Sequence, residues 1–156
     1  MPIQARKSDR RRIVVLALLA PLLWACGEDA SRPYLEFAGG GFVFNYRTAN
    51  HYYGFVVRQQ RPLPEGARLK VSFEVPRGKT ETQEEPAVPG RLQYKFQTGD
   101  LEGIEQGHPY TATLVVLDTN GKEIARLKKS FKTEVDQSEL PERPLVKGPG
   151  YEPAPQ

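Results

Sequence analysis

Residues 68–75 read Arg-Leu-Lys-Val-Ser-Phe-Glu-Val, and this stretch decides the fold of the chain. Apolar and polar side chains alternate at every position, which is the period of a β-strand with one face in a core and the other in solvent. Turn-forming residues bound the stretch on both sides, at 61–66 and 76–78. We therefore predict a strand at 68–75 whose four apolar side chains face the core.

Short runs with the same alternation lie before and after this strand. They occupy residues 42–47, 52–59, 92–97 and 110–117. In the run at 92–97 the apolar set is Leu92, Tyr94 and Phe96. In the last run Val115 and Leu117 add apolar side chains to the second face, which favours a central strand.

Three stretches depart from simple alternation. Residues 34–37 form a short apolar run, which Ala-Gly-Gly-Gly at 38–41 is expected to break off from the next strand. We interpret these glycines as a bend or bulge that admits close approach of the backbone. Residues 79–84 are polar and charged, so they predict a thin edge strand whose charges discourage further pairing. The apolar residues of 123–135 fit a helix nearly as well as a strand, and the Asn-Gly hairpin turn at 118–122 favours the strand.

About seven short strands joined by turns predict an all-β fold, a single antiparallel β-sandwich over residues 34–135. Residues 104–110 read Ile-Glu-Gln-Gly-His-Pro-Tyr. This spacing resembles a tyrosine corner, in which a Tyr that opens a strand bonds back to the preceding loop. The segment is therefore similar to fibronectin type III and immunoglobulin-like sandwiches. The chain has no immunoglobulin Cys pair, which makes the fibronectin variant the better match.

Residues 136–156 change composition and carry a proline every few positions. Such a segment cannot enter a sheet interior or a helix, so we predict an extended Pro-rich C-terminal tail. Two roles remain open for it. In the first, the tail is a spacer or packs on its own domain through Leu145, Val146 and Tyr151. In the second, it docks on another envelope protein, and we slightly favour packing over docking.

The N-terminal segment has the layout of an export signal. A basic head with five Lys or Arg residues precedes an apolar stretch at 13–23, which is too short to span a membrane. The segment ends in Leu-Trp-Ala-Cys at 23–26, and Cys26 is the only cysteine. It resembles a bacterial lipoprotein signal with its lipobox. The resemblance implies removal of residues 1–25 as a signal peptide, a lipid on Cys26, and a tether over 26–33.

The basic character of the chain belongs to this leader. Without residues 1–25, the 22 basic and 19 acidic residues fall to 17 and 18. The remaining segment is close to neutral and has no basic stripe with interleaved aromatics, so we expect no nucleic-acid partner.

No arrangement of residues predicts chemistry. The only histidines, His51 and His108, are both expected in solvated turns, and neither pairs with a second His or a thiol at metal-ligand spacing. The serines lie in no nucleophile-elbow context, and the glycines at 39–41 precede a strand rather than a helix. We predict that the protein is not an enzyme and uses no metal or cofactor.

An aromatic cluster at 42–55 is the remaining candidate for function. Alternation sends most of its rings to the core, whereas Tyr52 falls out of phase and should be more exposed. Exposed Tyr, Asn and Arg on loops of a rigid sandwich are typical of binding surfaces. We predict a contact patch made of Arg47, Asn50, His51 and Tyr52.

These features predict a lipid-anchored protein of the bacterial cell envelope that faces the periplasm. The lipid on Cys26 would attach it to a membrane, and Gly27 in place of the usual retention Asp slightly favours the outer membrane. The expected role is a non-catalytic protein-interaction or assembly module with another envelope protein as partner. The alternative is a lipoprotein that binds glycan or peptidoglycan on exposed aromatics.

Overall fold

The computed structural model describes residues 31–150 and 152–154 of the chain. The folded unit spans Arg32–Gln156. The predicted signal peptide at 1–25 and the lipidation site at Cys26 lie outside the described residues.

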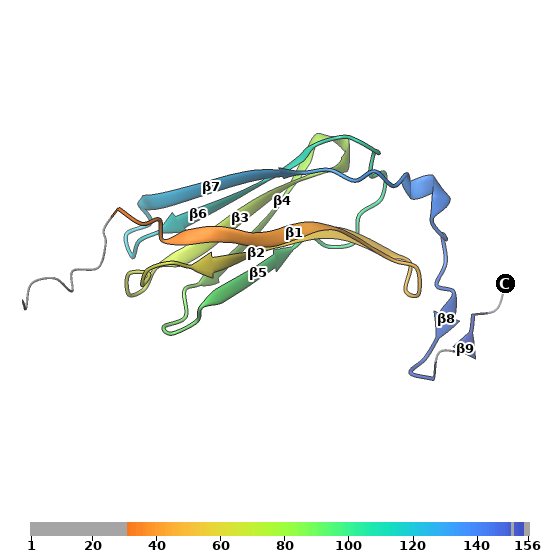
Figure 1. The fold of residues 1–156 in the computed structure, drawn as a ribbon, viewed down its shortest axis with the longest axis horizontal. Helices are drawn as coiled ribbons and strands as arrows, with labels where there is room; N and C mark the ends of the chain where they lie inside the picture. Colours follow the sequence, from red (N-terminus) through yellow and green to blue (C-terminus); the bar gives the residue numbers. More distant parts are fainter. Residues whose placement is uncertain (1–30, 151, 155–156) are drawn as a thin grey trace, which may run out of the picture. The chain divides into compact units, whose positions relative to one another are not determined.

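The folded unit contains two antiparallel sheets that face each other, as Figure 1 shows. The first sheet has the order β1-β2-β5, with bounds Leu35–Asn45, Asn50–Gln59 and Gln93–Gln97. The second sheet has the order β4-β3-β6-β7, with bounds Lys79–Pro86, Arg68–Val75, Tyr110–Leu117 and Glu123–Phe131. The predicted all-β, antiparallel sandwich is confirmed.

Most strand predictions are confirmed as well. β3 and β6 have the predicted bounds, and β6 lies inside its sheet between β3 and β7. Residues 123–131 pair with β6 along their length, so the ambiguous stretch is a strand. The charged strand β4 lies at the edge of its sheet, where its charges oppose pairing with another chain.

The bulge predicted for the glycines at 38–41 is confirmed, whereas the break predicted between two strands there is wrong. β1 continues through the glycines, and its register with β2 shifts between Phe37 and Gly39, which leaves one residue in a β-bulge. Glycine is required here by packing, because a Cβ on Gly40 would lie 2.6 Å from the Gly54 carbonyl oxygen and 2.8 Å from the Phe131 ring. The glycines therefore permit a close strand contact instead of ending the strand.

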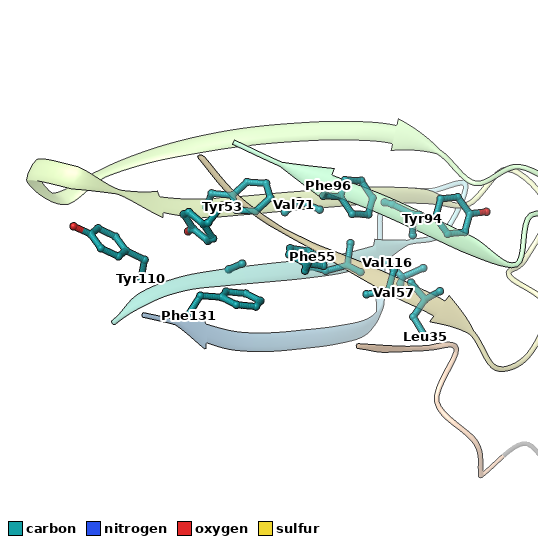
Figure 2. Close-up of a cluster of buried hydrophobic side chains, with 14 of the residues drawn as sticks. Leu35, Tyr53, Phe55, Val57, Val71, Tyr94, Phe96, Tyr110, Val116 and Phe131 are labelled. Atoms are coloured by element: carbon teal, nitrogen blue, oxygen red, sulfur yellow. The ribbon is translucent and has the colours of Figure 1, made fainter. Parts of the chain in front are cut away.

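Aromatic and aliphatic side chains from both sheets fill the space between them (Figure 2). The Tyr53 ring lies edge-on to Phe73, with ring centroids 5.3 Å apart, and its hydroxyl donates to the Glu74 carbonyl oxygen at 2.6 Å. Tyr53 thus joins β2 of one sheet to β3 of the other. Leu92 departs from its predicted place beside Tyr94, because β5 starts one residue later and 68% of Leu92 is exposed.

Two loops show the predicted local chemistry. In the β6–β7 hairpin Gly121 has a φ of +80° and donates to the Asp118 carbonyl oxygen at 3.0 Å. In the loop before β6, the Tyr110 hydroxyl accepts a hydrogen bond from the Glu105 amide at 3.0 Å. The bond that the tyrosine-corner spacing predicts is therefore present.

The C-terminal segment is less extended than predicted. It contains the short 3-10 turn η3 (Gln137–Glu139) and a hairpin of β8 (Val146–Lys147) and β9 (Glu152–Pro153). Leu140 is buried, whereas Leu145 is 57% exposed and Val146 is half-buried. Leu145 therefore does not fill an apolar gap as predicted, and Tyr151 lies outside the described residues.

Candidate functional site

The turn between β1 and β2 carries Arg47, the first residue of the predicted patch. The Asn45 side-chain oxygen accepts from the amide of Arg47 at 3.1 Å, and Ala49 has a φ of +51°. These features turn the chain sharply and leave Tyr46 half exposed at its tip. Arg47 lies beside a groove of about 490 Å³ that Arg143 and Lys147 of the C-terminal segment also line.

Asp100 ties the start of β2 to the loop before β6. One of its carboxylate oxygens accepts from the Asn50 side-chain amide at 3.0 Å, and the other accepts from the His51 backbone amide at 2.6 Å. The Leu101 amide in turn donates to the His51 carbonyl oxygen at 2.7 Å. The Asn50 side-chain amide, which we predicted to be part of a binding patch, is thus hydrogen-bonded to Asp100 within the fold.

His51 is buried, which corrects the prediction of a solvated turn residue. Only 7% of it is exposed, and its Nδ1 atom lies 3.2 Å from Nε2 of Gln137. The Gln137 amide is oriented by two backbone groups, since its Oε1 accepts from the Ile104 amide at 2.7 Å and its Nε2 donates to the Leu101 carbonyl oxygen at 3.0 Å. We therefore assign Nδ1 as an acceptor. His51 anchors the end of the sandwich and cannot serve as a surface contact.

Beside this network lies an acidic hollow of about 700 Å³. Asp100, Glu102, Asp136 and Glu142 are among its lining residues. Two of these carboxylates already serve the fold. Asp100 holds β2, and Asp136 accepts from the Ser138 hydroxyl, a bond that with the Ser138 amide lowers the pKa of Asp136. Within residues 31–150 and 152–154, no group of three His, Cys, Asp or Glu side chains is arranged to hold a metal ion.

Tyr52 faces the opposite way from His51, onto the outer face of the β1-β2-β5 sheet. Its partner across the ladder is Val43, which is 41% exposed. The next outward position pairs Gly41 with Gly54, and both lack a side chain. Tyr52 therefore stands at the side of a bare stretch of backbone.

We name this surface the outer strip. It consists of Gly41, Val43, Tyr52, Gly54 and Val56, with Lys95 and Gln97 of β5 at its margin, and these residues line a shallow depression of about 360 Å³. Gly54 is structurally required, since a Cβ there would lie 2.4 Å from the Phe96 carbonyl oxygen, whereas a Cβ on Gly41 would meet nothing within 4 Å. The strip offers apolar contact and exposed backbone.

The four residues of the predicted patch therefore separate into different places. Arg47 lies at the turn, Asn50 and His51 support the end of the sandwich, and Tyr52 lies on the outer strip. Sequence reasoning missed the other residues of the strip. Their signal was the pairing of adjacent apolar residues at 42–43, 52–53 and 56–57, because two neighbours on one strand must face opposite sides of the sheet.

No family model matches this chain, and the search of curated proteins found none similar to it. A helix with the length and apolar character needed to span a membrane is absent from the part of the chain that the structure describes. His108, the other histidine, is exposed in the loop before β6, and its ring lies 4.6 Å from that of Tyr110.

Proposed function

We propose that this chain is a lipid-anchored protein of the bacterial cell envelope, facing the periplasm, whose sandwich binds another envelope protein and catalyses no reaction. The leader with its Leu-Trp-Ala-Cys ending supports the anchor. The outer strip supports the interaction role, because the β1 and β2 positions of this face carry only glycine, valine and tyrosine, with Val43 exposed and Tyr52 half-buried, and the charged Lys95 lies at the β5 margin. Aromatic and apolar side chains without charge are typical of the centre of a protein interface.

A matched pair of surface variants tests the interaction role. Val43→Ser with Tyr52→Ala removes apolar area from the outer strip, whereas Val115→Ser with Thr113→Ala changes the outer face of β6 in the other sheet. Quantitative crosslinking and co-purification from envelope fractions should show a loss of the partner of about tenfold or more for the first pair only. Equal recovery of the partner with both pairs would contradict the proposal.

The anchor is tested separately. Mass spectrometry of the mature protein should show a chain that starts at Cys26 and carries a diacylglyceryl thioether. The Cys26→Ser variant should lose the lipid and leave the membrane fraction, since burial of each acyl CH₂ contributes about 0.8 kcal/mol to membrane affinity. Sucrose-gradient separation of the two membranes tests the outer-membrane preference that Gly27 suggests.

The fibronectin-like resemblance is part of the proposal. Strand β4 pairs with β3 and not with the β1-β2-β5 sheet. In constant-type immunoglobulin domains the fourth strand belongs to the sheet of the first two, so the order here favours the fibronectin variant. The bond from Glu105 to the Tyr110 hydroxyl supports the same assignment.

Glycan binding is the second candidate, and the position of Tyr52 favours it. The ring stands next to the bare backbone of Gly41 and Gly54, with the Gln97 amide at the margin, so the C–H face of a pyranose ring has room on the floor and its hydroxyl groups meet polar groups at the rim. Sedimentation with isolated peptidoglycan separates the two functions. Tyr52→Ala should abolish co-sedimentation if the strip binds glycan, and Tyr46→Ala, at an exposed tyrosine of the β1–β2 turn, is the control.

A further inference from the structure

One end of the sandwich gathers the start of β1 and two loops. The Gln60 amide donates to the Tyr34 carbonyl oxygen at 2.9 Å, and the Gln59 amide donates to the Leu92 carbonyl oxygen at 2.8 Å. The entry of the chain, the β2–β3 loop and the β4–β5 loop are thus neighbours (Figure 1). The β1–β2 turn lies at the other end of the same ladder, because Leu35 pairs with Gln59 and Asn45 pairs with Asn50.

We name the first end the entry end, and it exposes apolar side chains. Leu92, at 68%, is the most exposed large hydrophobic residue in the described part of the chain, and Val88 in the same loop is 41% exposed. Pro62, Leu63 and Val88 also line a hollow of about 350 Å³ between the two loops. No protein segment among the described residues covers Leu92.

Two arginines flank these apolar residues. The Arg61 guanidinium lies 3.5 Å from the centre of the Tyr34 ring, and Arg91 lies over Tyr94 at 5.3 Å. Arg91 also forms an ion pair with Glu85 at 3.5 Å, with 47% of its side chain exposed. Guanidinium groups bind phosphate oxygens well, and their stems tolerate an apolar environment.

The length of chain between this end and Cys26 decides what can meet it. Leu35 follows Cys26 by nine residues. Nine residues reach at most about 30 Å when fully extended. A lipid on Cys26 would therefore hold the entry end, and not the β1–β2 turn, close to the membrane surface.

We propose that the entry end rests on the phospholipid surface, with Leu92 and Val88 in the headgroup region and Arg61 and Arg91 at the lipid phosphates. This inference rests on the proposed lipidation of Cys26. Exposed Leu and Val next to arginines fit the boundary between headgroups and acyl chains, where apolar groups enter to a depth of about 5–10 Å. The contact fixes the orientation of the domain, so that the β1–β2 turn faces away from the membrane.

Tryptophan fluorescence tests this orientation, because Trp24 is the only tryptophan and would leave with the leader. Leu92→Trp places a single reporter at the entry end, and Tyr46→Trp places a matched one at the exposed β1–β2 turn. Each mature lipoprotein is reconstituted in phosphatidylethanolamine–phosphatidylglycerol vesicles with and without brominated acyl chains. The entry-end reporter should lose about half of its emission to the bromine atoms and shift to shorter wavelength, whereas the reporter in the turn should change little.

A further variant separates lipid contact from simple proximity. Val88→Asp in the Leu92→Trp background should reduce the quenching, because a carboxylate opposes entry into an anionic headgroup layer. Equal quenching of both reporters, no quenching of either, or no effect of Val88→Asp would overturn the proposal. Mass spectrometry of the same samples reports the lipid on Cys26. Its absence would contradict the proposed function, whereas its presence without selective quenching would contradict the orientation alone.

Discussion

The outer faces of the two sheets differ in the polarity of the side chains that they present to solvent. On the β4-β3-β6-β7 face, polar groups pair with each other across strands, as Arg68 does with Glu84 at 2.9 Å and the Thr111 hydroxyl with that of Ser130 at 3.1 Å. On the β1-β2-β5 face, the middle is the outer strip, with glycine and exposed apolar residues. The first face satisfies its own polar groups, and the second leaves area that another molecule can cover.

The difference is clearest between β3 and β2, since β6 also carries Val115 and Leu117 on its outer face. Both sheets cover the same core, so burial alone would allow polar outward residues on each. β3 has Arg, Lys, Ser and Glu at its outward positions, whereas β2 has Tyr52, Gly54 and Val56 at the middle of its own. The four predictions below test this contrast, from the largest expected effect to the smallest.

The largest effect should come from Gly40, which lies next to the strip and faces the core, with Gly41 of the strip as its control. Gly40→Ala should lower the free energy of unfolding by about 3 kcal/mol, because its Cβ would lie 2.7 Å from the Phe55 Cβ and overpacking is costly. Gly41→Ala should leave the free energy of unfolding unchanged or raise it by up to about 1 kcal/mol, since its Cβ meets nothing within 4 Å and alanine restricts the unfolded chain. Urea unfolding measures both. Equal losses of unfolding free energy would mean that Gly41 also contributes to packing, and the outer strip would then not be a free surface.

The next effect concerns binding. Tyr52→Ala should weaken partner binding by about tenfold, equivalent to about 1.4 kcal/mol, because aromatic residues near the centre of an interface carry much of its energy. Lys70→Ala on the outer face of β3 should leave the affinity unchanged. Surface plasmon resonance with the partner that the crosslinking experiment identifies measures both affinities. A larger loss with Lys70→Ala would assign binding to the charged face.

The third effect is a pH dependence of stability that arises from Tyr53, whose hydroxyl joins the two sheets by a hydrogen bond. Burial, followed by the nearby Glu74, raises the pKa of the Tyr53 phenol far above its ordinary value. Above pH of about 10 the unfolded chain releases this proton while the folded chain keeps it, so stability should fall with rising pH by up to about 1.4 kcal/mol per unit. Tyr53→Phe should show a shallower slope. Stability measured between pH 9.5 and 11.5, about the ordinary Tyr pKa, checks this, and parallel slopes would contradict the assignment.

The smallest effect belongs to the charged face. Glu84→Gln breaks the ion pair with Arg68. The Arg68 side chain is 46% exposed and the Glu84 side chain is 37% exposed. Exposed pairs contribute about 0–1 kcal/mol and are screened by salt. The melting temperature should therefore change between low and high salt slightly more for the unmodified protein than for the variant. If Glu84→Gln lowered the free energy of unfolding by more than about 2 kcal/mol, the charged pairs of this face would contribute more to stability than exposed ion pairs usually do.

Much of the fold could be predicted from local pattern. Alternation located β3 and β6, and the Asn-Gly turn resolved residues 123–131 as a strand. The glycine run at 38–41 correctly predicts a bulge but wrongly predicts a break between strands, because glycine has the same local signature in a turn and in a bulged strand. Its actual role depends on Gly54 and Phe131, which lie far along the chain.

The candidate site could be predicted only in part. Alternation correctly sent Tyr52 outward from the buried Tyr53. It could not show that Asn50 and His51 are held by Asp100 and Gln137, which lie 50 and 86 positions further along the chain, respectively. No propensity links residues at such separations, so the division of the predicted patch became visible only with the packed sandwich.

The sequence by itself determined the strands, their turns and which side chains share a face, because these follow from backbone geometry within a few residues. The tertiary structure alone decided which faces meet, where bare backbone is exposed, and that Leu92 lies beside the entry of the chain. Those properties arise when two sheets pack and exclude water, and that step depends on contacts between residues distant in sequence.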